Sequence, residues 1–225
     1  MTPFRLILIT DRATARLPLL EAVEAALAGG VDAVQLRDKD LPADERYRLG
    51  RELSAMVRRH GAQFLVNDRI DLALALRAHG VQLGAASLPI GQARRLLPPE
   101  CRIGYSAHSP AEAEGAALAG ADFVVLAPVY APGSKSARGG VSDVARPPLP
   151  PRCLGAGTVR ATAAALTVPV YALGGITPDR ITEVMAPPTP GESSPAGVAV
   201  ISHMLASQEP GAAARDLARA LGAAS

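Results

Sequence analysis

Eight short apolar runs, each followed by a longer segment of helical period, divide this chain of 225 residues into similar units. Runs rich in Val, Ile and Leu indicate buried strands, and the apolar spacing of the longer segments indicates amphipathic helices. This alternation is typical of a parallel sheet, because parallel strands need a crossover connection between them. The predicted strands are Arg5–Thr10, Ala33–Leu36, Gln63–Asn67, Gly80–Gly84, Arg102–Ser106, Asp122–Val129, Val168–Gly175 and Gly197–Ser202.

The helical segments set the size of each unit. They include residues 19–30, 44–61, 69–80 and 109–121, and most of them end in glycine, which suits a helix C-terminus. Eight units in 225 residues leave roughly 28 residues for each, near the lower end for a (βα)8 barrel. Eight parallel strands with such short loops are too many for a compact open sheet. We therefore predict the α/β class, with residues 1–225 forming a single (βα)8 TIM-barrel domain.

Two proline-rich segments, Val144–Gly157 and Ala186–Gly197, interrupt this alternation. Proline is excluded from helix interiors, so these segments are predicted to be irregular. Neither is long enough to separate two domains, and we interpret both as surface insertions.

Composition and charge argue against several classes of protein. Lysine and arginine number 23 against 21 acidic residues, so the net charge of +2 provides no field that would attract nucleic acid or an anionic membrane. The segment MTPFRLILITDR holds an apolar run too short for a signal peptide or a membrane span. The distant Cys101 and Cys153 form neither a CxxC pair nor a disulfide framework. We expect a cytoplasmic protein with small-molecule partners, and self-association into a homo-oligomer stays open.

Four charged residues follow the second predicted strand without a gap. In a parallel barrel the carboxyl ends of the strands converge on one mouth, where sites form. Gln35, Arg37 and Lys39 alternate, so in an extended conformation they point the same way, and two cations on one face suit a polyanionic substrate. The alternative is a solvated strand end in which Asp38 and Asp40 are ion-pair partners of these cations.

Polar residues also follow the third and fifth predicted strands. Asn67 and Asp68 offer an amide oxygen and a carboxylate, and Mg²⁺ prefers a few such oxygens together with substrate phosphates. The alternative is that one of them caps the next helix, a common role for both residue types. Ser106 and His108 follow the fifth strand. We expect no catalytic role for His108 or for His203, which lies in a later helical segment.

Three further strand ends favour phosphate binding. The Gly/Ser-rich loop after the sixth strand carries Ser134 and Lys135, whose groups suit an anion. Barrels often bind a phosphate after the seventh and eighth strands, where this chain has Gly174, Gly175, Ile201 and Ser202. The alternative for the two glycines is a tight turn without a ligand. Two phosphorylated groups in one mouth suit a reaction that joins two substrates and releases diphosphate.

Six motifs, in this order and over nearly the whole chain, resemble those of the thiamine phosphate synthase and TenI-like superfamily: QLRDKD, NDRIDLAL, GYSAHS, APVYAPGSKS, ALGGITPDR and AVISHMLASQEP. The resemblance implies a (βα)8 transferase that couples hydroxymethylpyrimidine diphosphate with thiazole phosphate, giving thiamine phosphate and pyrophosphate. It implies Mg²⁺ as cofactor, with Asp68 as its ligand. By the same resemblance, Gln35, Arg37 and Lys39 would hold the pyrimidine diphosphate, and Asn67 and Asp68 would bind the pyrimidine and Mg²⁺. The pyrophosphate would be bound by Ser106, Ser134 and Lys135, and the thiazole phosphate by Gly175, Ile201 and Ser202.

This sequence departs from the synthase pattern after the fourth strand. Where the family reads GQED, this chain has GAAS, which puts Ser87 at the position of a second Mg²⁺ ligand. Whether Asp71 or Asp38 replaces that ligand stays open. A TenI-like thiazole tautomerase and a non-catalytic regulatory protein that binds thiazole phosphate or thiamine phosphate are the alternatives. The histidine that tautomerases carry after the sixth strand is Pro128 here, as in synthases, so we favour the synthase.

Overall fold

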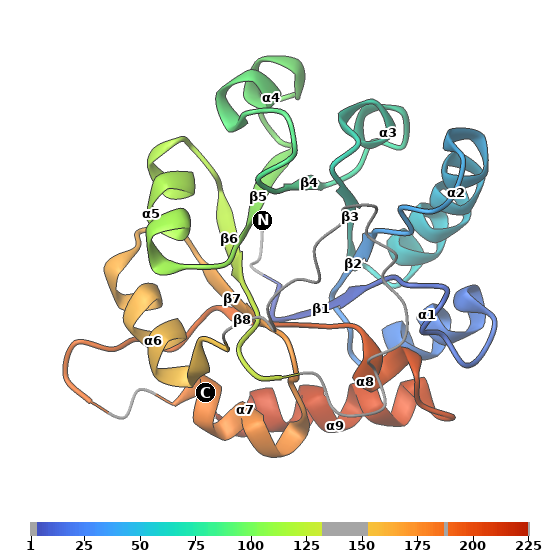
Figure 1. Cartoon of the computed structure of the whole chain (residues 1–225). Coiled ribbons are helices and arrows are strands. Elements are labelled where there is room, and N and C mark those ends of the chain that lie inside the picture. The colour runs from blue at the N-terminus through green and yellow to red at the C-terminus, as the bar shows by residue number, and fades with distance from the viewer. Residues whose placement is uncertain (1–3, 132–152, 187–188, 225) are drawn as a thin grey trace, which may run out of the picture.

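The computed structural model describes residues 4–131, 153–186 and 189–224. The eight strands in these ranges are parallel and pair in chain order, and β1 pairs with β8, so the sheet closes into a barrel (Figure 1). The strands are β1 (Leu6–Ile9), β2 (Ala33–Leu36), β3 (Gln63–Asn67), β4 (Gly80–Leu83), β5 (Arg102–Ala107), β6 (Phe123–Leu126), β7 (Val170–Leu173) and β8 (Gly197–Val200). The predicted (βα)8 barrel is confirmed.

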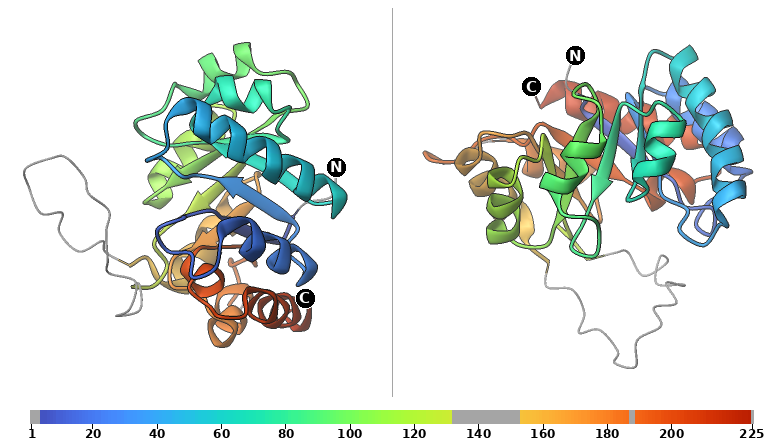
Figure 2. Two further views of the ribbon diagram at one scale, coloured as in Figure 1. Left: turned by 90° about the vertical axis from the view of Figure 1, so that its right-hand side faces the viewer. Right: turned by 90° about the horizontal axis from the view of Figure 1, so that it is seen from above.

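Helices surround the barrel on its outer side, as both views in Figure 2 show. The described ranges contain α1 (Leu19–Ala28), α2 (Ala43–Arg59), α3 (Ile70–Ala75), α4 (Ile90–Leu96), α5 (Pro110–Leu118), α6 (Gly155–Ala165), α7 (Pro178–Met185), α8 (Ser202–Leu205) and α9 (Pro210–Ala223). The last helix, α9, packs against both α1 and α7 and so covers the seam between β1 and β8. None of these helices is both long enough and apolar enough to cross a membrane.

Several predicted elements end earlier in the structure than in the sequence pattern. β2 and β3 are confirmed at both ends, whereas the predicted strand at 168–175 shortens to β7. Gly174 and Gly175 have φ angles of 106° and 64°, which belong to the left-handed region and cannot continue an extended strand. The predicted helical segment 69–80 shortens to α3, and Arg77 beyond it has a φ of 48°.

Alternating side chains along each strand build two separate apolar layers. Outward-facing residues such as Leu8, Val34 and Val81 pack under the helices. Inward-facing residues fill the barrel, and they are Phe4, Ile7, Ile9, Ala33, Leu65, Phe123, Val125, Tyr171 and Ala199. Because side chains alternate with period two, six of the strands contribute apolar residues to both layers, whereas β4 and β5 contribute apolar residues only to the outer one.

Three aromatic rings fill the amino-terminal end of the barrel. Phe4 stacks on Tyr171 with ring centroids 4.9 Å apart, and Phe123 meets both rings edge-on at 5.3 and 5.7 Å. The Tyr171 hydroxyl donates to the Phe4 carbonyl oxygen at 3.0 Å. This aromatic floor, formed by Phe4, Phe123 and Tyr171, closes the end of the barrel opposite to the carboxyl ends of the strands.

Candidate active site

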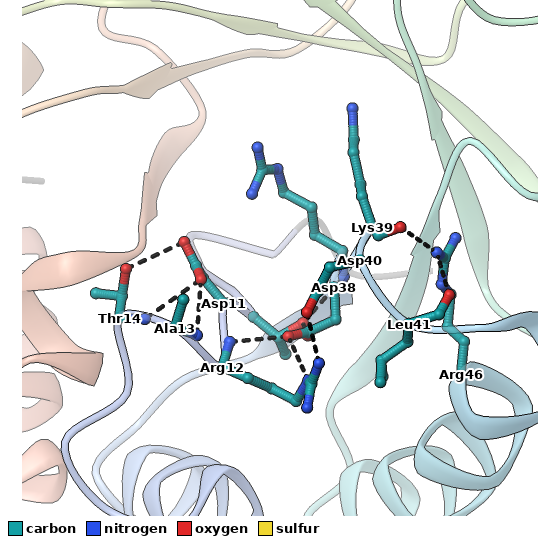
Figure 3. Close-up of polar contacts among 11 residues, drawn as sticks. Asp11, Arg12, Ala13, Thr14, Asp38, Lys39, Asp40, Leu41 and Arg46 are labelled. Atoms are coloured by element: carbon teal, nitrogen blue, oxygen red, sulfur yellow. Dashed lines mark hydrogen bonds and ion pairs between the residues drawn. The ribbon is translucent and has the colours of Figure 1, made fainter. Parts of the chain in front are cut away.

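A buried carboxylate ties together the segments that follow β1 and β2 (Figure 3). Asp38 is 3% exposed, and its two oxygens accept from the Thr10 hydroxyl and, at 2.8 Å, from the Arg12 backbone N–H. The Arg12 guanidinium lies 3.4 Å from Asp38 and 2.6 Å from Asp40. Both acids therefore pair with Arg12 and not with the cations that follow β2, which corrects the alternative of a solvated strand end.

The side chains of Arg37 and Lys39 are left available by this arrangement. In the described part of the chain, neither side chain makes a hydrogen bond or an ion pair, and Figure 3 shows Lys39 extended away from the contacts around Asp38. Arg46 donates to the backbone oxygens of Lys39 and Leu41 at 2.6 and 2.8 Å, which holds the loop in place. Gln35 is 3% exposed and lies in β2 between outward-facing neighbours, so it faces the barrel interior.

A cavity of about 250 Å³ opens among the carboxyl ends of β2 to β5. Four of the predicted site residues line it. They come from three separate parts of the chain: Lys39 follows β2, Asn67 and Asp68 lie at the end of β3, and Ser106 lies in β5. The complete lining is Lys39, Asn67, Asp68, Leu83, Gly84, Ala85, Ala86, Ser87, Ser106 and His108. A cation, a carboxylate, an amide and hydroxyl groups around one small hollow can bind a charged phosphate group together with a counter-ion.

The side chain of Asp68 does not cap the helix that follows it. Its φ is 65°, and its backbone N–H donates to the Gln82 carbonyl oxygen at 2.8 Å. The N-cap of α3 is Arg69, and no side chain caps that helix. The Asp68 carboxylate has no hydrogen bond or ion pair among the described residues, so its charge is available to a cation. An amide oxygen from Asn67 beside this carboxylate fits Mg²⁺, which keeps waters and substrate phosphates as further ligands.

Among the residues that the structure describes, Asp68 is the only acid that lines this cavity. Ser87 accepts from the Gly84 backbone N–H at 2.9 Å and so closes the turn after β4. Asp71 is bound by the Arg69 guanidinium, which lowers the pKa of its carboxyl group, and both oxygens of Asp38 are engaged as described. No cluster of three or more His, Cys, Asp or Glu side chains with metal-binding geometry occurs in the part of the chain that the structure describes.

Ser106 and His108 lie on the wall that β5 contributes. The Ser106 hydroxyl oxygen accepts from the side-chain amide of Gln82 at 3.0 Å. His108 places Nδ1 2.9 Å from the Ala127 carbonyl oxygen, which makes this nitrogen the protonated one. Reasoning from sequence gave His108 no role and overlooked Gln82, although a polar residue between Val81 and Leu83 of an apolar strand was a visible signal.

The ends of β7 and β8 provide backbone N–H groups at the same mouth. Gly174 and Gly175 turn the chain after β7, and a Cβ at Gly175 would lie 2.8 Å from the Tyr130 Cβ. The backbone N–H groups of Gly175, Ile201 and Ser202 donate to no acceptor in the ranges that the structure covers. Adjacent strands thus present unpaired donors, as phosphate-binding barrel ends do.

A network beneath these glycines fixes the segment that leads out of β6. The Arg180 guanidinium lies 4.5 Å from the Tyr130 ring centroid and donates to the Gly175 carbonyl oxygen at 2.6 Å. The Tyr130 hydroxyl donates to Glu183 at 2.6 Å, and burial together with this carboxylate raises the Tyr130 pKa to about 12. His203 lies in α8, where burial lowers its pKa and favours the uncharged ring. Ser134 and Lys135, predicted in the loop beyond, lie outside the described residues.

The closed barrel, the cation-bearing cavity over β2 to β5 and the N–H donors after β7 and β8 define a (βα)8 protein of the class that binds phosphorylated small molecules at its mouth. A family model described as thiamine monophosphate synthase matches residues 6–204. The chain therefore belongs to the thiamine monophosphate synthase family, as the resemblance of its motifs predicted.

Individual relatives agree with this assignment. A thiamine-phosphate synthase from Moorella thermoacetica is 40% identical over 211 residues, which cover 94% of this chain and 92% of the relative. A thiamine-phosphate synthase from Methanoregula boonei is 44% identical over 197 residues, covering 88% and 83%. The solved structure of thiamine phosphate pyrophosphorylase from Pyrococcus furiosus matches with a TM-score of 0.83 at 32% identity, covering 99% of this chain and 97% of that chain.

Proposed function

We propose that this protein is a thiamine-phosphate synthase, which couples hydroxymethylpyrimidine diphosphate with thiazole phosphate to give thiamine phosphate and pyrophosphate. The observation that carries the proposal is the cavity in which Lys39, Asp68 and Ser106 converge, together with membership of the family. We propose further that residues 1–225 act as one TIM-barrel domain on small phosphorylated substrates. The described elements from β1 to α9 support this, because the last helix covers the seam of the barrel.

The reaction needs charge neutralisation more than a strong base. The bond between the pyrimidine methylene carbon and the diphosphate oxygen breaks, and pyrophosphate leaves with the electron pair. The thiazole nitrogen then gives its lone pair to the methylene carbon, so a C–N bond forms and no proton has to move. Groups that stabilise the developing negative charge on pyrophosphate therefore determine the rate.

Residues that line the cavity, and others at or beyond the carboxyl ends of the strands, match that requirement. Arg37 and Lys39 have no intramolecular partner for their charges in the described structure, and we assign them to the diphosphate together with Gln35, Ser106, Ser134 and Lys135. Asp68 and Asn67 would hold Mg²⁺, which would offset charge on the diphosphate when bound. We assign the thiazole phosphate to the backbone of Gly174, Gly175, Ile201 and Ser202.

The test is formation of thiamine phosphate by the purified protein from the two substrates, with Mg²⁺ and with a chelator. We expect product only in the presence of Mg²⁺, and the variant Asp68→Asn, which keeps the shape and removes the charge, should require more metal. A parallel assay follows isomerisation of thiazole carboxylate phosphate. Isomerisation without coupling would identify a tautomerase, and binding of thiazole phosphate with neither activity would identify a regulatory protein.

A further inference from the structure

Gln82 is a buried polar residue directly beneath the candidate active site. It lies in β4 between Val81 and Leu83, which pack outward under the helices, so its own side chain faces the barrel interior. It is 3% exposed, and its neighbours in the sheet are Asn67 on β3 and Gly104 on β5. A polar amide in such a place requires an explanation, because burying it without partners costs stability.

The amide of Gln82 is only partly satisfied within the protein. Its Nε2 donates to the Ser106 hydroxyl oxygen at 3.0 Å, whereas its Oε1 is buried without a hydrogen-bond partner in the described structure. The next strand is shaped to admit it. A Cβ on Gly104 would lie 2.3 Å from Gln82 Oε1 and 2.3 Å from the Phe123 ring. The amide therefore occupies the space between the aromatic floor and Ser106, which only glycine at position 104 leaves open.

The direction of this hydrogen bond determines what Ser106 can offer to a ligand. A serine hydroxyl has one hydrogen to donate and two lone pairs that accept. Because Ser106 already accepts from the Gln82 amide, its own hydrogen stays free, and Ser106 lines the cavity. A hydroxyl with a free hydrogen is suited to an anionic oxygen, and such charge-assisted hydrogen bonds are stronger than neutral ones.

We infer that Gln82 is a positioning residue that holds the Ser106 hydroxyl as a hydrogen-bond donor toward the diphosphate group of the substrate. The inference rests on the proposed synthase function for the identity of the anion. Gln82 itself does not touch the substrate, since its free oxygen is buried against Gly104 and not in the cavity.

A double-mutant cycle tests this role. The variant Gln82→Met keeps the length of the side chain and removes the donor, and Ser106→Ala removes the hydroxyl. We expect Gln82→Met to raise the KM for the pyrimidine diphosphate by about 3- to 10-fold, the effect of one hydrogen bond, and to leave the KM for thiazole phosphate unchanged. In the Ser106→Ala background the same change should have no further effect, because residues that act through one contact are not additive. The control Gln92→Met alters an exposed glutamine on α4.

Additive effects of the two substitutions, or equal changes in both KM values, would overturn the inference. If Gln82→Met does not fold, Gln82→Leu replaces it, because leucine also lacks a hydrogen-bond donor. An unchanged KM in that variant would also contradict the role. Calorimetric titration with inorganic pyrophosphate and Mg²⁺ measures the binding affinity of the wild type, the two single variants and the double variant, and so repeats the cycle without turnover. Suppose that the two substitutions have non-additive effects on pyrophosphate binding, while the wild-type protein forms no thiamine phosphate. That result would overturn the proposed function and retain the inference.

Discussion

Lys39 carries an uncompensated charge into the cavity because its acidic neighbours are engaged elsewhere. Asp38 and Asp40 both pair with Arg12, on the other side of the loop. A charge pair between adjacent residues would have reduced the electrostatic attraction that a diphosphate experiences. In the order Arg-Asp-Lys-Asp, the two acids hold the loop through Arg12, and the two cations at the alternate positions remain available to attract a ligand.

The substitution Lys39→Ala should weaken use of the diphosphate substrate selectively. We expect the KM for the pyrimidine diphosphate to rise by about 10- to 100-fold, since a hydrogen bond to a charged group contributes on the order of 1.5–3 kcal/mol. The KM for thiazole phosphate should stay within twofold of the wild-type value. Steady-state kinetics with each substrate varied in turn measures both constants.

The control for Lys39→Ala is Arg48→Ala, which removes an exposed cation from α2. That variant should change neither constant, because an exposed ion pair contributes little. Equal losses for both substrates in Lys39→Ala would contradict the division of the mouth into two phosphate sites.

Restoring an acid at position 87 should strengthen metal binding. Ser87 lines the cavity together with Asp68, and Asp can accept from the Gly84 N–H as the serine does. We expect Ser87→Asp to tighten Mg²⁺ binding without substrates by about tenfold, because each added carboxylate increases the affinity of a hard cation. Isothermal titration calorimetry measures the change. Ser207→Asp, outside the cavity, should leave Mg²⁺ affinity unchanged, and a similar gain there would indicate a general charge effect.

At the scale of single elements, one tripeptide that occurs twice shows which site residues could be predicted from the sequence and which could not. Val-Gln-Leu occurs in β2 and again in β4, with both glutamines facing the barrel interior. Gln35 was predicted as a site residue because charged residues follow its tripeptide, whereas the tripeptide of Gln82 is followed by Gly84 and two alanines. The role of Gln82 depends on Ser106 and Gly104 of another strand, and that proximity follows from register, which the sequence does not state.

Element boundaries were predictable where composition changes abruptly and not elsewhere. β2 and β3 are followed by charged residues, and both were predicted to the residue. The apolar pattern of the predicted strand at 122–129 continues past Leu126, the last residue of β6. Pro128 has no N–H for the strand ladder, so apolarity alone overestimates the strand. Cavity residues from β2 to β5 were predicted because the barrel brings strand ends together, but Asp38 was not recognised as buried.

The turn after β7 should be intolerant of a side chain. Gly175→Ala places a Cβ 2.8 Å from the Tyr130 Cβ at a φ of 64°, which costs on the order of 1–2 kcal/mol for a residue other than glycine. We expect the KM for thiazole phosphate to rise about tenfold and the melting temperature to fall by about 2–8 °C. Kinetics and differential scanning calorimetry measure these effects.

Gly91 provides the matched control for Gly175. It lies in α4, and a Cβ there would meet nothing within 4 Å. Gly91→Ala should leave kinetics unchanged and stabilise the helix by up to about 1 kcal/mol. If Gly175→Ala lowers the melting temperature without changing the KM for thiazole phosphate, the turn has only a structural role.

At the scale of the whole molecule, the two ends of the barrel have different tasks. The aromatic floor of Phe4, Phe123 and Tyr171 is buried at one end, and the cavity opens at the other. In barrels of this kind, residues at the amino-terminal end contribute to stability while the carboxyl-terminal end carries the chemistry.

The variant Tyr171→Phe should lower the stability of the protein without changing its catalysis. It removes the hydroxyl that donates to the Phe4 carbonyl oxygen, and leaving a buried acceptor unpaired costs about 1–3 kcal/mol. We expect urea unfolding to show that loss of stability, while kcat and both KM values stay within twofold of the wild type. A reduced kcat in a variant that remains folded would show that the floor influences the mouth.

The aromatic floor also has a consequence for how the chain is made. Phe4 is synthesised well before its ring partners Phe123 and Tyr171, and β1 is synthesised well before β8, the strand with which it pairs. Until then the growing polypeptide exposes strand edges and inward-facing apolar side chains, a situation that favours aggregation. Closure of the barrel can therefore follow only after β8 has been synthesised, because β8 supplies the pairing partner of β1.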